Sequence, residues 1–300
     1  MIPGNISLSG IFPPMLTPFK KNGDVDYDAF TRNIEKWNQY ELGGYLVLGS
    51  NSETSYLTED EKLKLIELTV QAAAKGKTIL AGTGMESTRE TIRLTNEAAR
   101  CGAHAALVLT PCYYGGNMTD TALIHHFTAV AENMEIPILL YNVPKFTNIN
   151  LTAEVVRVLS EHPNIIGMKD SKGDAAQLEI FKNAASPDFT VIVGTASTLY
   201  PALALGIRAG ILALANCAPA ECIQIYQSFL QGKEEEAEKN FTRMLPVNKA
   251  VTGTYGIPGL KYAATLLGYE GGMVRSPLLE LTDAEKETMK NILKEAGLLL

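Results

Sequence analysis

Short apolar segments recur along this 300-residue chain at intervals of roughly thirty residues, and each is followed by an amphipathic stretch. This alternation is typical of repeated strand–helix units. Several of the segments are apolar throughout, which indicates strands buried on both faces and therefore a parallel sheet. The eight strands that we predict lie at residues 10–17, 43–48, 78–81, 105–109, 136–141, 165–169, 190–193 and 210–214. Eight such units close most economically into a (β/α)8 barrel, and the chain length suits one such barrel.

Helix-start signals support this reading. Thr58 is followed three residues later by Glu61, and Ser87 is followed in the same way by Glu90. Both pairs predict a capped helix N-terminus in the gap between two strands. A doubly wound open sheet is the competing fold, but no Gly-x-Gly-x-x-Gly motif follows the first strand, as a dinucleotide-binding sheet would require.

The helical pattern continues beyond the eighth strand for longer than one crossover helix needs. The further helices that we predict lie at 219–231, 233–251, 260–267 and 283–296. No linker rich in Gly, Ser or Pro separates them from the barrel. We therefore expect a catalytic barrel at 1–232 and a C-terminal helical region at 233–300 that docks on the barrel.

Composition excludes several classes of function. A net charge of -7 argues against a nucleic-acid partner, because a basic footprint is missing. No apolar run approaches the length of a membrane span, and the N-terminus does not resemble a targeting signal, so we expect a cytoplasmic protein. The cysteines form no Cys-x-x-Cys pair, and the neighbouring His125 and His126 cannot share a ligand face on a helix. We expect neither a metal nor an organic cofactor.

One lysine stands out because of its position. Lys169 closes the apolar run 165–168 at the end of the sixth predicted strand. Desolvation can lower the pKa of a lysine and turn it into an amine nucleophile, suited to a Schiff base with a carbonyl substrate. Two structural alternatives remain open at this point. The aliphatic chain of Lys169 could pack on the core while its ammonium reaches water, or Asp170 could form an ion pair with the ammonium.

Polar residues follow the other predicted strands as well. In a (β/α)8 barrel the carboxyl ends of the strands form one active surface. The segments that meet there are 49–53, 110–114, 141–144, 169–171, 194–195 and Asn216. They supply an amine, phenols, hydroxyls and backbone donors but little fixed positive charge, which suits carbon–carbon chemistry on a small keto acid. A phosphate ester is the weaker alternative, because Gly194 is the only glycine in the segments after strands seven and eight.

In these motifs the chain resembles the dihydrodipicolinate synthase and N-acetylneuraminate lyase family of pyruvate-type class I aldolases. The motifs that carry the likeness are Gly49-Ser-Asn-Ser-Glu53, Thr110-Pro-Cys-Tyr113, Tyr141-Asn-Val-Pro144, Gly167-Met-Lys-Asp170 and Gly194. Within the family, the chain is most similar to 4-hydroxy-2-oxoglutarate aldolases, in segments that include Thr110-Pro-Cys-Tyr-Tyr114, Ala122-Leu-Ile-His-His126 and Gly256-Ile-Pro-Gly-Leu-Lys261.

The resemblance implies a role for each matching residue. Lys169 would form the imine with pyruvate, and Tyr141 would be the general acid and base. Tyr113 would relay protons from a neighbouring subunit, and Ser50 would link the two phenols. The residues implied to bind the substrate are Ser50, Asn51, Ser171, Gly194 and Ile211. The resemblance also implies at least a dimer and suggests a homotetramer built as a dimer of dimers.

Two positions depart from the family pattern. Phe146 stands where dihydrodipicolinate synthases carry an arginine that holds the second substrate, aspartate semialdehyde. Ser52 replaces a glycine and would be strained if its φ were positive. We therefore expect cleavage of a 4-hydroxy-2-oxo acid such as 4-hydroxy-2-oxoglutarate. The alternatives are 4-hydroxy-tetrahydrodipicolinate synthesis and, from another class, a catalytically silent barrel that senses a ligand.

Overall fold

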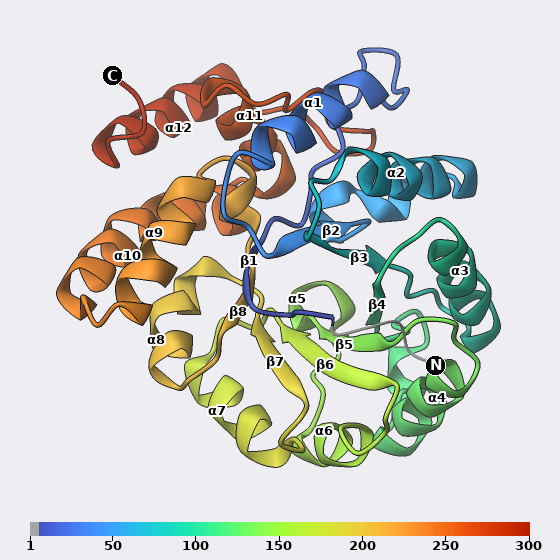
Figure 1. The fold of residues 1–300 in the computed structure, drawn as a ribbon. Helices are drawn as coiled ribbons and strands as arrows, with labels where there is room; N and C mark the ends of the chain where they lie inside the picture. The colour runs from blue at the N-terminus through green and yellow to red at the C-terminus, as the bar shows by residue number, and fades with distance from the viewer. Residues whose placement is uncertain (1–5) are drawn as a thin grey trace.

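The computed structural model describes residues 6–300 and contains a (β/α)8 barrel, as the sequence predicts (Figure 1). The strands are hydrogen-bonded in the order β1-β8-β7-β6-β5-β4-β3-β2, and every pair is parallel. Their bounds are β1 Gly10–Phe12, β2 Gly44–Val47, β3 Thr78–Gly82, β4 Ala105–Leu109, β5 Ile138–Asn142, β6 Ile165–Asp170, β7 Thr190–Val193 and β8 Ala209–Ile211. Backbone bonds from Gly43 N to Ile11 O (2.9 Å) and from Met15 N to Leu46 O (2.9 Å) join the first two strands and close the ring.

Two strands, β1 and β8, end well before their predicted ends. β1 ends at Phe12 rather than at residue 17, because Pro13 and Pro14 have no N–H to donate to a ladder. β8 ends at Ile211 because the chain turns into a 3-10 helix at Ala213–Asn216. The apolar residues beyond both ends stay buried, so hydrophobicity alone could not place these boundaries.

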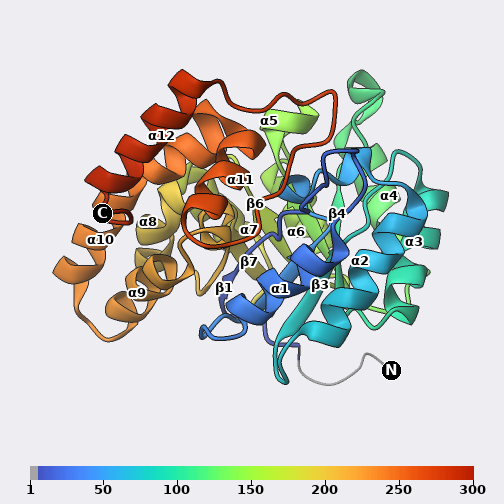
Figure 2. The same cartoon turned by 90° about the horizontal axis from the view of Figure 1, so that it is seen from above.

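The helices of the barrel lie outside the strands, except for the short helix after β5, which lies at one end of the barrel (Figure 2). Their bounds are α1 Tyr27–Trp37, α2 Glu59–Ala72, α3 Thr88–Arg100, α4 Asp120–Glu132, α5 Pro144–Thr147, α6 Ala153–Leu159, α7 Ala175–Ala184 and α8 Leu199–Ala204. The predicted capping box of α2 is confirmed: Thr58 Oγ1 accepts from Glu61 N, and Glu61 accepts from Thr58 N. Ser87 caps α3 by accepting from Glu90 N at 3.2 Å.

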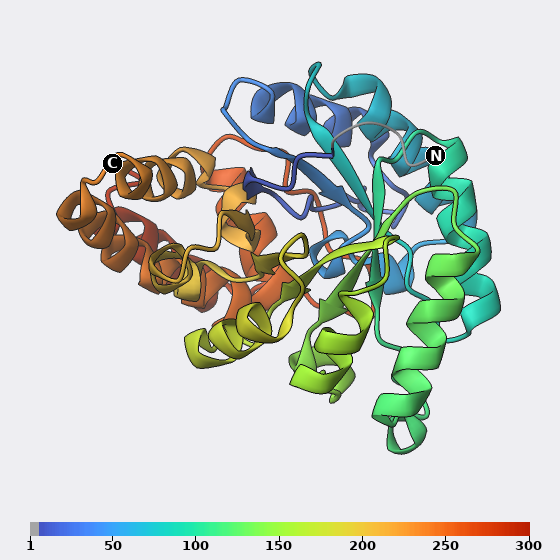
Figure 3. The same ribbon diagram turned by 60° about the horizontal axis from the view of Figure 1, so that its bottom comes forward.

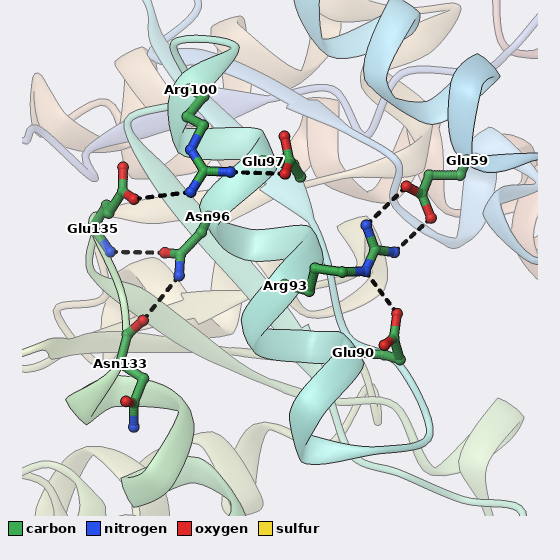
Figure 4. A network of polar contacts seen from close by, with 8 residues as sticks. All are labelled: Glu59, Glu90, Arg93, Asn96, Glu97, Arg100, Asn133 and Glu135. Carbon is green, nitrogen blue, oxygen red and sulfur yellow. Dashed lines mark hydrogen bonds and ion pairs between the residues drawn. The ribbon is translucent and has the colours of Figure 1, made fainter.

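Charged side chains join the outer surfaces of neighbouring units (Figure 4). From α3, Arg93 reaches Glu59 on α2 at 2.5 Å and Glu90 on its own helix at 2.8 Å. One end of the same helix is tied to the segment before β5 through Arg100 and Glu135 at 3.4 Å. Each pair is exposed and contributes little to stability, so the ring is held mainly by its core.

Four further helices follow the barrel and gather on one side of it (Figure 3). They are α9 Pro219–Leu230, α10 Glu234–Lys249, α11 Gly256–Leu266 and α12 Asp283–Glu295, which confirms the four predicted segments. A π-helical turn, Ala250–Thr254, joins α10 to α11. The segment between α11 and α12 crosses toward α5 (Figure 2). The domain boundary at residue 232 stays a prediction.

The barrel interior is packed rather than hollow. One buried cluster fills it with side chains from every strand except β6, among them Phe12, Leu46, Leu107, Leu139 and Ile192, and Ile166 of β6 packs against this cluster. A larger cluster lies between the strands and the surrounding helices. A packed interior confines any binding site to an end of the barrel. Within residues 6–300, no helix is long and apolar enough to cross a membrane.

Candidate active site

Lys169 lies on β6 and is buried, with 3% of its surface exposed. The register of the sheet places it beside Tyr141 on β5. Directly paired residues of neighbouring strands point to the same face, and the Lys169 ammonium lies 4.3 Å from the centroid of the Tyr141 ring. The two side chains therefore form one pair at the carboxyl end of the barrel.

Neither structural alternative for Lys169 agrees with this geometry. Because 3% of its surface is exposed, Lys169 does not extend along the protein surface into bulk water but faces the inside of the barrel end. Asp170 follows it on the strand and so points to the opposite face. There, Asp170 Oδ1 accepts from Asn142 Nδ2 (2.6 Å) and Gln177 Nε2 (3.0 Å). The Asp170 carboxylate thus orders the loops around β6 rather than pairing the lysine.

Tyr141 is placed to exchange protons. Its hydroxyl lies 3.3 Å from Ser50 Oγ. Burial raises the pKa of the Tyr141 phenol, but the positive charge of Lys169 and hydrogen bonds with Ser50 and Ser171 outweigh it, so the pKa is lowered. A phenol with a lowered pKa gives up its proton more readily and can serve as a base.

Ser50 and Asn51 begin a 3-10 turn, Ser50–Ser52, after β2. The first amides of a helix have no carbonyl partner within it, and both residues line the cavity described below. Their N–H groups are therefore available to an anion. Ser52 is not strained, because the left-handed residue is its neighbour Glu53, at φ 55°. The Ser52 hydroxyl instead donates to Met15 O at 2.5 Å.

Gly194 follows β7 where two backbones come close together. A Cβ at this position would lie 2.0 Å from Ser171 Oγ and 2.6 Å from Asp170 O. Gly194 N donates to Asp170 O at 2.7 Å. Glycine therefore lets the loop after β7 approach Ser171, and both residues line the cavity.

A cavity of about 820 Å³ opens above Lys169. The barrel residues that line it include Ser50, Asn51, Tyr141, Lys169, Ser171 and Gly194. Residues 251–258, around the π-helical turn, and residues 277–279 form another part of its wall. These segments follow the barrel in the sequence, so the polar residues at the strand ends do not predict them. A π-turn is frequent at functional sites, but the sequence gives no clear signal for one.

Two cations also line the cavity, in contrast to the expectation of little fixed positive charge. They are Lys145, on α5 after β5, and Lys172, three residues after Lys169. The expectation was wrong because it considered only the first two or three residues after each strand. In this structure the lining continues two residues further along each of these segments, to Phe146 and to Gly173.

Two predicted residues lie outside the cavity lining. Tyr113, on the loop after β4, is 78% exposed and stacks edge-on with Tyr114. Its backbone N–H and that of Cys112 both donate to Glu86 Oε2 at 2.9 Å, which holds this loop outward. Ile211 is fully buried within the barrel, in the same cluster as Tyr141.

A (β/α)8 barrel with a buried lysine beside a hydrogen-bonded tyrosine defines the class of lyases that act through a lysine Schiff base, the class I aldolases. Residues 7–296 match the model of the Dihydrodipicolinate synthetase family. The chain belongs to this family of pyruvate-type class I aldolases. Membership in an enzyme family, with Lys169 and Tyr141 both present, argues against a silent barrel.

Individual relatives match this chain over almost its whole length. A curated relative named 4-hydroxy-tetrahydrodipicolinate synthase, from Methanothrix thermoacetophila, is 36% identical over 286 residues, 95% of each chain. Dihydrodipicolinate synthase from Bacillus anthracis superposes with a TM-score of 0.92 at 28% identity, covering 97% of this chain and 99% of that one. The enzyme from Acinetobacter baumannii, solved with pyruvate, gives 0.92 at 30% identity, covering 98% and 100%.

Proposed function

We propose that this chain makes or breaks a carbon–carbon bond next to the carbonyl of pyruvate, through an imine at Lys169. The observation that carries the proposal is the buried Lys169–Tyr141 pair, with an ammonium 4.3 Å from the ring and a phenol whose pKa is lowered. A buried amine beside a proton acceptor is what imine formation requires. The carboxylate of pyruvate would accept from the free amides of Ser50 and Asn51.

The steps follow from the chemistry of an imine. The Lys169 amine adds to the keto carbon of pyruvate, and loss of water leaves a protonated imine. Removal of a proton from the pyruvate methyl group gives an enamine, whose carbon attacks an aldehyde. Hydrolysis then releases the product and frees Lys169. Tyr141, with Ser50 at 3.3 Å, would move the protons in each step.

The aldehyde that the comparisons favour is aspartate semialdehyde. The curated relative at 36% identity is named for 4-hydroxy-tetrahydrodipicolinate synthesis, and the solved neighbours are dihydrodipicolinate synthases. The comparisons give no support to our expectation of a 4-hydroxy-2-oxoglutarate aldolase. We therefore propose condensation of pyruvate with aspartate semialdehyde as the leading activity.

Cleavage of 4-hydroxy-2-oxoglutarate is the second candidate activity, and the phenylalanine at position 146 favours it. Phe146 lines the cavity and is 54% exposed. Its ring cannot form the paired hydrogen bonds that an arginine makes with a carboxylate. Ser171, which the resemblance implies to bind the substrate, also lines the cavity.

Two assays separate the candidates: condensation of pyruvate with aspartate semialdehyde, and release of pyruvate from 4-hydroxy-2-oxoglutarate. Faster condensation, by kcat/KM, supports the synthase, and faster release supports the aldolase. We expect Phe146→Arg to improve kcat/KM for the semialdehyde by about tenfold, because a charged hydrogen bond is worth ~1.5–3 kcal/mol. Phe146→Leu is the control, and an equal gain in both variants would contradict the argument from the missing guanidinium.

A further inference from the structure

The charged side chains that line the cavity are all positive. Among the described residues, those that line it include three lysines, Lys145, Lys169 and Lys172, and no aspartate or glutamate. The whole chain has a net charge of -7. A local excess of positive charge in a cleft of an acidic protein attracts anions to that cleft. Since Lys169 is expected to be consumed as an imine, two ammonium groups remain to be explained.

Neither ammonium group is fully paired. An ammonium has three N–H donors, and Lys145 Nζ donates to one acceptor in the described part of the chain, Thr252 O, at 2.8 Å. Lys172 Nζ donates to Gln177 Oε1 at 2.8 Å and lies 3.3 Å from Asp174 Oδ2. Both lysines therefore keep donors for a ligand in the cavity.

Asp174 offsets only part of the charge of Lys172. It is the N-cap of α7, and its Oδ1 accepts from Ala176 N at 3.0 Å and Gln177 N at 3.3 Å. A carboxylate at this position already compensates the positive end of a helix. Asp174 and the neutral Gln177 thus hold Lys172 in place while leaving its charge partly unbalanced.

The cavity, at about 820 Å³, is also much larger than pyruvate requires, because sites of ~300–1,000 Å³ hold drug-sized ligands. The pyruvate carboxylate is assigned to the amides of Ser50 and Asn51, after β2, whereas Lys145 and Lys172 follow β5 and β6. Three strand steps separate β2 from β5 in the ring. A second anionic group, further along the substrate, would face these two lysines.

We propose that Lys145 and Lys172 bind a second carboxylate, so that the reaction partner of pyruvate is an acidic aldehyde and the full carbon skeleton is a dianion. This inference rests on the proposed Lys169 imine but not on the choice between the two candidate reactions. It assigns recognition of the second carboxylate to two lysines on neighbouring loops, in place of an arginine guanidinium at position 146.

Borohydride trapping with 2-oxo acids tests the inference without knowledge of the natural aldehyde. Two acids of equal length differ only at their far end: 2-oxoglutarate carries a second carboxylate, and 2-oxopentanoate ends in a methyl group. We expect half-maximal trapping at Lys169 at about tenfold lower concentration of 2-oxoglutarate, since charged hydrogen bonds favour it. The Lys145→Met, Lys172→Met double variant should lose this preference, while Lys64→Met, on exposed α2, should keep it.

Trapping of pyruvate in the same samples separates the possible failures. An unchanged pyruvate adduct in the double variant shows that the variant is folded and can form the imine. If the wild type traps pyruvate but does not prefer 2-oxoglutarate, or if the double variant keeps the preference, the dianion site is wrong. If no sample traps pyruvate at Lys169, the proposed function itself fails, and this inference with it.

Discussion

At the scale of single residues, the proposed chemistry depends on the proton affinity of Tyr141. Its phenol has an ordinary pKa near 10, and the structure lowers it through Lys169, Ser50 and Ser171 against the opposing effect of burial. Tyr141→Phe removes the proton acceptor while leaving the amine. We expect kcat to fall by about 10²–10⁴-fold, the usual contribution of a positioned acid or base, in steady-state assays. A variant with nearly full kcat would exclude Tyr141 as that group.

The hydrogen bond between Ser50 and Tyr141 can be tested through the pH dependence of kcat/KM. A base must be deprotonated, so kcat/KM should rise with pH through the Tyr141 pKa, which lies below its ordinary value. A hydrogen bond from Ser50 stabilises the Tyr141 phenolate, so loss of this hydrogen bond raises the pKa of Tyr141. In Ser50→Ala the rising limb of the pH profile should therefore move to higher pH. Ser50→Thr keeps a hydroxyl and should restore the position of the limb; a limb that stays in place in Ser50→Ala would refute this coupling.

At the scale of elements, a buried ion pair fixes the turn that carries Ser50 and Asn51. Lys261 on α11 lies 2.5 Å from Glu53, and both side chains are almost fully buried. Lys261 Nζ also donates to Met273 O at 2.6 Å. The pair thus ties the loop after β2 to the C-terminal helices that close the cavity.

Removal of one partner from this pair should be costly. In Lys261→Met the buried Glu53 carboxylate loses its direct ion-pair partner and keeps the backbone N–H of Arg275 at 2.8 Å; removal of one partner of a buried pair typically costs about 3–5 kcal/mol. We expect the free energy of unfolding, measured by urea titration, to fall by that order near neutral pH. Lys286→Met, at an exposed pair on α12, is the control and should change stability by less than about 1 kcal/mol. Equal effects in both variants would contradict the role of burial.

The same pair predicts a dependence on pH. Burial lowers the pKa of Lys261 to about 8, against the opposing effect of Glu53, from ~10.4 in an unfolded chain. Between these values the unfolded state binds more protons, so stability rises with pH. The contribution of Lys261 should therefore grow from about pH 8 to pH 10 and be smaller below. Urea titrations of the wild type and Lys261→Met across this range check the sign, because other groups titrate alike in both.

At the scale of the whole molecule, Tyr113 raises the question of assembly. It is 78% exposed and lies outside the cavity of its own chain. If it completes the site of a neighbouring subunit, mixed oligomers of Lys169→Ala and Tyr113→Phe should regain activity that neither variant has alone, since some sites receive one intact copy of each residue. Analytical ultracentrifugation of the wild type should show at least a dimer. A fully active monomer would exclude a shared site.

The sequence predicted the architecture because each strand carries its own apolar run and helices such as α2 and α3 begin at a side-chain cap. Barrel geometry predicted that Lys169 and Tyr141 share one surface, because it brings strand ends together, and the family resemblance implied their roles. The sequence could not predict the cavity wall around residues 251–258 and 277–279, which depends on how helices after the barrel pack back onto it. It also missed Lys145 and Lys172, because a lysine in a loop has no local signal of the cavity that it faces.

The central claim is that Lys169 forms an imine with pyruvate. Incubation with pyruvate and borohydride, followed by peptide mass spectrometry, tests it most directly. We expect a single reduced pyruvate adduct on the peptide that contains Lys169, and none in Lys169→Arg, which keeps the charge but not the nucleophile. An adduct on another lysine, such as Lys261, or no adduct at all, would contradict it.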